Sequence, residues 1–201
     1  MQDLSNAIRR TCVQHFNCSV AEYCCPVWAG SSYTTVIDTQ LHNAMRLISG
    51  CLQPMQLSWL PVLSNVAPPS LRHKEATDSM LQIIEAHPNW PVYADVFERP
   101  SPRLASRCPV RSDMTSVDTI TQWREDWSST SLVNHTIVTD PTIRQPGFSL
   151  PRHTWSLINH FQTGQGPCRA DLHKWGLAQS HSCDCGQQQT MNWTSLLTLA
   201  H

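Results

Sequence analysis

The apolar positions of the chain recur at helical spacing. The clearest pattern covers residues 33–49, and Gly50 follows it at the position where a left-handed cap ends a helix. Pro54 then prevents the helix from continuing. Four apolar side chains repeat at 4-4-3 spacing and share one face: Ile37, Leu41, Met45 and Ile48. We therefore expect a helix from about residue 33 to residue 49.

The other apolar patterns are also helical, with little of the alternation that predicts strands. Pro61 is expected to interrupt a short, strongly buried helix. Trp123 and Trp127, four residues apart, are expected to seal a core or an interface. The further helices are expected at about residues 57–63, 69–86, from 116 onward, 151–161 and 170–175. The prediction is a mainly α fold built from short helices.

Prolines divide the chain into segments. Five of the fourteen prolines fall within residues 87–112, which excludes a long helix there and predicts an extended linker. We expect an N-terminal segment outside the main pattern (1–18), a helical region (19–86), a basic Pro-rich linker (87–115), a C-terminal helical module (116–182) and a Cys-x-Cys tail (183–201).

The overall composition limits which binding partners and which cellular compartment we expect. The formal net charge is −1, so any binding of nucleic acid must come from local patches. The longest apolar stretches fall far short of the ~20 residues that span a bilayer, and no signal-like segment begins the chain. We expect no membrane contact and an intracellular protein whose nine cysteines are mostly reduced core thiols. Nucleus and cytoplasm are not distinguished, because no basic localisation cluster stands out.

Arginines recur every four residues within the predicted linker, with no acid between the first and the last. Neighbouring prolines prevent this tract from forming a helical stripe. An extended basic tract can follow a phosphate backbone, each arginine releasing counterions, while a solvated linker explains the pattern equally well. The four arginines are Arg99, Arg103, Arg107 and Arg111.

Cys183 and Cys185 form the most metal-like pair in the chain. Structural zinc takes four thiolate or imidazole ligands in a tetrahedron, and this pair supplies two. The competing interpretation, which we favour, is a pair of free thiols on a loose tail. The candidates for the remaining zinc ligands, none at a knuckle spacing, are Cys168, His173, His181 and His201.

The tripeptide Tyr93-Ala94-Asp95 superficially matches a metal-binding motif of polymerases. Two-metal phosphoryl transfer needs several carboxylates held around both cations. Here a valine follows Asp95, and prolines flank the stretch. We expect no catalytic role for it.

Three sets of short motifs follow one another between residues 19 and 192. They are Ala21-Glu22-Tyr23-Cys24-Cys25-Pro26-Val27-Trp28 with Asp38-Thr39-Gln40-Leu41 and Met45-Arg46-Leu47-Ile48-Ser49-Gly50; Leu60-Pro61-Val62-Leu63 with Pro68-Pro69 and Leu71-Arg72; and Thr163-Gly164-Gln165-Gly166-Pro167-Cys168 with Leu172-His173-Lys174-Trp175-Gly176-Leu177-Ala178 and Cys183-Asp184-Cys185-Gly186. As an ordered set they resemble the C-terminal part of the reverse transcriptase of jockey-like non-LTR retrotransposons.

The resemblance implies a thumb-like helical region, a linker and a C-terminal knuckle that help a polymerase hold RNA or DNA, with Lys174 among the contacts. In that family the RNA-directed DNA polymerase activity and its Mg²⁺ belong to the palm, upstream of the matched region. We therefore expect a chain that contacts nucleic acid and the palm without being catalytic. Trp193 and Thr198 stand where the family's knuckle has a histidine and a cysteine, which weakens the expectation of zinc.

Two other classes of function stay open. A helical interaction module or an inert remnant, in either case without nucleic-acid affinity, agrees with the low net charge and the missing knuckle ligands. An independent Cys/His enzyme would need a nucleophile, a base and an orienting group. That hypothesis requires Cys24 or Cys168 beside a histidine.

Overall fold

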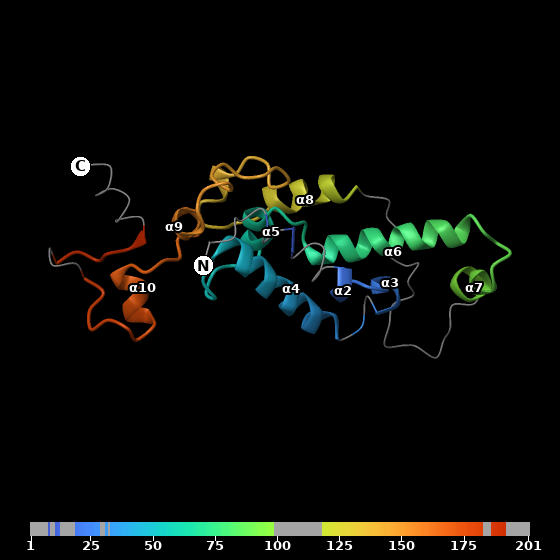
Figure 1. Cartoon of the computed structure of the whole chain (residues 1–201), viewed down its shortest axis with the longest axis horizontal. Coiled ribbons are helices and arrows are strands. Elements are labelled where there is room, and N and C mark those ends of the chain that lie inside the picture. The colour runs from blue at the N-terminus through green and yellow to red at the C-terminus, as the bar shows by residue number, and fades with distance from the viewer. Residues whose placement is uncertain are drawn as a thin grey trace.

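The computed structural model describes residues 8, 11–12, 19–28, 31, 33–98, 118–182 and 186–191. Within these ranges the chain is mainly α-helical, as predicted (Figure 1). No helix among them is long and apolar enough to cross a membrane. In chain order the elements are α2 (Ser19–Ala21), α3 (Cys25–Trp28), α4 (Thr34–Ser49), α5 (Trp59–Ser64), α6 (Pro69–Glu85), α7 (Pro91–Tyr93), the π-helical η2 (Ala94–Glu98), α8 (Thr119–Ser128), the 3₁₀ helix η4 (His135–Ile137), α9 (Arg152–Thr163) and α10 (Arg169–Lys174).

Helix α4 matches its sequence pattern closely. Leu41, Met45 and Ile48 are almost fully buried along one face, and Ile37 packs against the same core. Gly50 ends the helix in the left-handed conformation at φ 69°, and its N–H donates to the Arg46 carbonyl. The expected helix and its glycine cap are both confirmed.

The expectation that Pro61 interrupts the neighbouring helix is wrong. Helix α5 runs through Pro61, and all six of its residues are buried. Pro61 is the third residue of the helix, where the backbone N–H has no intrahelical acceptor, so its missing donor costs little. Asn65 then ends the helix in the left-handed conformation at φ 52°.

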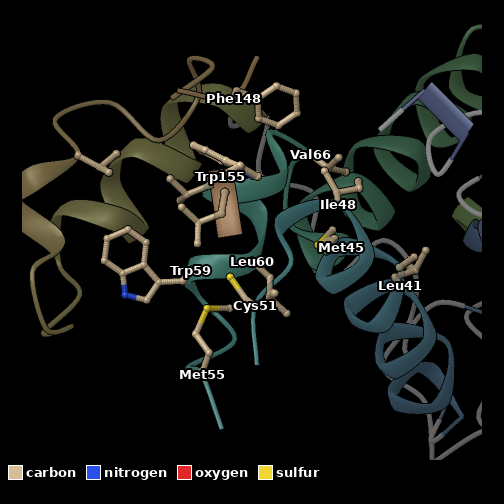
Figure 2. Close-up of a cluster of buried hydrophobic side chains, with 14 of the residues drawn as sticks. Leu41, Met45, Ile48, Cys51, Met55, Trp59, Leu60, Val66, Phe148 and Trp155 are labelled. Carbon is tan, nitrogen blue, oxygen red and sulfur yellow. The ribbon is translucent and has the colours of Figure 1, made fainter. Parts of the chain in front are cut away.

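One hydrophobic core joins these helices to the second half of the chain (Figure 2). Trp127 of α8 packs edge-on against Trp59 of α5, with ring centroids 5.0 Å apart. Phe148 and Trp155 form a second edge-on pair at 5.5 Å. The core therefore contains side chains from both sides of the predicted 87–115 linker.

Helix α6 extends away from this core, and α7 lies beyond its far end, while α10 lies at the opposite end of the molecule (Figure 1). Residues 91–98 are helical, so the expectation of an extended chain is wrong for this part of the linker. Pro91 occupies the first position of α7, where a preset φ favours the start of a helix. Asp95, which belongs to the polymerase-like tripeptide, is exposed in η2.

Candidate functional site

A partly buried polar cluster links the N-terminal helices to α6. Glu22, in the turn between α2 and α3, forms an ion pair with Arg72 of α6. Its second carboxylate oxygen lies 3.5 Å from Nε2 of His73, and Nδ1 of that ring lies 3.8 Å from a carboxylate oxygen of Asp38 on α4. The Trp28 and His73 rings are packed edge-on, with centroids 4.9 Å apart. His73, 5% exposed, thus lies between two acids contributed by two different segments.

The cluster keeps its glutamate ionised. Burial by itself raises the pKa of Glu22, but the nearby His73 ring and the Arg72 guanidinium outweigh burial and leave that pKa below its usual range. In the described residues no group of three or more His, Cys, Asp and Glu side chains is arranged to hold a metal ion. Because Arg72 pairs with Glu22 and the His73 ring lies between the two acids, the arrangement is suited to joining helices.

An open groove lies between α2 and the second half of α4. Its volume is about 860 Å³. The floor is largely apolar, and Arg46 of α4 and Arg152 of α9 also line it. Its apolar lining consists of Val20, Ala21, Leu41, Ala44, Leu47 and Cys51.

The two guanidinium groups of the groove have no carboxylate partner among the described residues. Arg46 donates from Nη1 to Oδ1 of Asn43 at 3.2 Å, while its Nε is shielded from solvent without a hydrogen-bond partner. Arg152 donates from Nη1 to the Leu47 carbonyl at 2.7 Å. Both cations therefore retain donors that an anion could take up.

Helix α9 fixes one edge of this groove by capping α4. The last four carbonyls of a helix have no N–H donor within the helix and need donors from elsewhere. Three side chains of α9, spaced one turn apart, supply donors to the end of α4. The contacts are Arg152 to the Leu47 carbonyl (2.7 Å), Ser156 Oγ to the Gly50 carbonyl (2.8 Å) and Asn159 Nδ2 to the Ser49 carbonyl (2.7 Å).

Of the predicted nucleic-acid contacts, the structure describes only Lys174. Arg99, Arg103, Arg107 and Arg111 lie outside the described residues, as do Cys183 and Cys185. Lys174 is exposed in the last turn of α10. The basic tract and the zinc pair therefore remain predictions.

Two of the proposed additional zinc ligands lie near each other. The rings of His173 and His181 lie 5.7 Å apart, centroid to centroid. Ser182 forms an isolated antiparallel bridge with Gln188, and the N–H of Gln189 donates to the His181 carbonyl at 3.2 Å. Imidazole and thiolate are ligands that zinc takes, so His173 and His181 stay candidates for the zinc site that the sequence predicts.

The Cys/His enzyme hypothesis gains no support from the described cysteines. The Cys168 thiol donates to the Asp171 carboxylate at 3.4 Å, and burial together with that acid raises the pKa of Cys168. The Cys25 thiol donates to the His73 backbone carbonyl at 4.0 Å. Burial also raises the pKa of Cys51, to about 11. Thiols in such surroundings stay protonated at neutral pH and are poor nucleophiles.

Sequence reasoning missed Arg46 and Arg152 as candidate binding residues. Arg46 lies within a recognised motif, and the residues three and four away from it include no acid. That absence indicates a cation without an ion-pair partner on its own helix. No local sequence pattern predicts that Arg152, 106 positions away, lies near Arg46.

No protein-family model, curated protein or solved structure matches the chain.

Proposed function

We propose that the chain is a nucleic-acid-contacting remnant of a non-LTR retrotransposon reverse transcriptase. In reverse transcription of the parent element it helps to hold RNA or DNA and performs no catalysis itself. The RNA-directed DNA polymerase chemistry and its Mg²⁺ belong, on this proposal, to a separate palm against which the helices pack.

The observation that carries the proposal is the pairing of Glu22 with Arg72. These residues come from two of the short motifs on which the resemblance rests, and 50 positions separate them. A third motif supplies Asp38. Its carboxylate approaches Nδ1 of His73, whereas that of Glu22 approaches Nε2 of the same ring. Unrelated chance matches would not be expected to place their side chains in contact. The contacts among these three motifs therefore favour treating the motifs as parts of one inherited unit.

Binding on this proposal is electrostatic and weak. The net charge of −1 supplies no long-range attraction, so affinity depends on a few local phosphate contacts. The predicted contacts are the arginine tract and Lys174. Such contacts position a nucleic acid without reading its sequence.

A second candidate function is a helical interaction module without nucleic-acid affinity. Exposed apolar side chains gather along α2 and α3: Val20 is 77% exposed, Tyr23 76% and Val27 70%. Tyr33 and Val36, at the start of α4, are also exposed. A surface of this kind suits a protein partner, and its binding would change little with salt.

Titration of the purified chain with a labelled single-stranded RNA, at two salt concentrations, tests the proposal. The five predicted phosphate contacts imply a roughly 130-fold loss of affinity between about 50 and about 200 mM salt. With Arg103→Ala and Arg107→Ala together, three contacts remain and the loss falls to roughly eighteenfold. Arg144→Ala, which removes an exposed arginine of another loop, is the matched control and should leave the salt dependence unchanged. No binding at the lower salt concentration would refute the proposal and favour the interaction module.

A further inference from the structure

The groove between α2 and α4 combines an apolar floor with two cationic side chains at its edge. We propose that this groove binds a phosphorylated nucleoside, with Arg46 and Arg152 holding the phosphate and the floor receiving the base. The unit is either one nucleotide of a single strand or a free nucleotide. The first case rests on the proposed function and the second is independent of it.

The charge of the groove favours an anion. The described side chains that line it include two arginines and no carboxylate. On α6, Arg72 pairs with Glu22, and His73 lies between Glu22 and Asp38. Among the described residues no carboxylate compensates the two guanidinium charges of the groove.

Arg46 is held ready for such a ligand. Its Nε is shielded from water and has no hydrogen-bond partner, which leaves a buried donor unsatisfied. Asn43 fixes one end of the guanidinium at 3.2 Å, so little side-chain freedom is lost on binding. Arg152 is fixed in the same way by the Leu47 carbonyl. A planar guanidinium presents paired donors whose geometry matches phosphate oxygens.

The rest of the groove suits a nucleoside. A volume of about 860 Å³ falls within the range of small-ligand sites. Aliphatic side chains offer a flat apolar surface to a base, while Gln40, Asn43 and Gln53 add amide groups at the lining. An amide carries both donors and acceptors, as the edges of bases do.

The test measures binding of AMP, inorganic phosphate and a short single-stranded RNA to the full chain at low salt. Arg46→Gln should weaken binding of AMP and RNA by at least about tenfold, because a hydrogen bond to a charged group is lost. Arg46→Lys keeps the charge without the paired donors and should give an intermediate loss. Arg144→Gln, outside the groove, should change neither affinity. A urea midpoint for each variant shows whether it is folded, and Arg152→Gln provides a second, independent disruption.

The outcomes separate the two proposals. Loss of AMP and RNA affinity in both groove variants, with the control unchanged, supports a strand-binding groove. AMP binding that depends on Arg46, without any RNA binding, supports a free-nucleotide site and refutes the proposed function. RNA binding that is unaffected by Arg46→Gln and Arg152→Gln overturns the groove and leaves the proposed function standing. Binding of phosphate as tight as AMP overturns the role of the apolar floor, and with it the nucleoside.

Discussion

Replacing Asn159 with alanine should break a buried polar link between the two halves of the chain. The Asn159 side chain is fully buried and donates to the Ser49 carbonyl at 2.7 Å, across 110 positions of sequence. Ser49 is buried as well, so water cannot take over the lost contact. An orphaned buried acceptor costs roughly 1–3 kcal/mol, and the vacated volume adds to that cost. We therefore expect the free energy of unfolding to fall by about 2–4 kcal/mol.

Urea unfolding followed by tryptophan fluorescence measures this change, because Trp59 and Trp155 are buried in the core and become exposed on unfolding. Leu157→Ala is the matched control, since Leu157 lies on the same helix and is 48% exposed. That variant should shift stability by no more than about 0.5 kcal/mol. If Asn159→Ala destabilises the chain no more than Leu157→Ala does, then the contact with Ser49 does not hold α9 against α4. The argument from an orphaned carbonyl would then be wrong.

Three further predictions concern the glycine cap, the acidic cluster and the zinc pair. Gly50→Ala should destabilise the chain more than Gly176→Ala in the same urea assay: both glycines have positive φ, but a Cβ at Gly50 would lie 2.8 Å from Ser156 Oγ and one at Gly176 would meet nothing within 4 Å. The pKa of Glu22 is lowered in the folded state, so its contribution to stability is present above the ordinary value of 4.5 and is lost as pH falls through the folded value. Glu22→Gln should therefore reduce stability at neutral pH and make the urea midpoint fall less steeply below pH 4.5 than in the parent chain; an identical pH profile would contradict this. A zinc site that includes Cys183 and Cys185 should give a cobalt–thiolate absorption band, and His173→Ala should weaken that band. His153 is an exposed histidine of α9, so the control variant His153→Ala should leave the band unchanged. Absence of the band in the parent chain would favour free thiols.

Local chemistry in the sequence was enough to predict most of the helices. The 4-4-3 spacing and Gly50 placed α4 correctly, because helical periodicity and a left-handed cap depend on neighbouring residues alone. The same local reasoning misjudged Pro61, since a proline is tolerated in the first turn and the start of the helix was not known. It also missed the helical residues 91–98, where Pro91 begins a helix.

Only the tertiary structure decided which polar side chains meet. Glu22 and Arg72 are 50 positions apart, and Asn159 and Ser49 are 110 positions apart. No local sequence pattern therefore predicts either contact. The candidate groove has the same origin: Arg46 could be recognised as a cation without an acid one turn away, but Arg152 joins it only because α9 packs across the end of α4. Helix formation depends on residues close in sequence, whereas a binding surface depends on which helices pack together, and that is settled by the burial of side chains contributed from the whole chain.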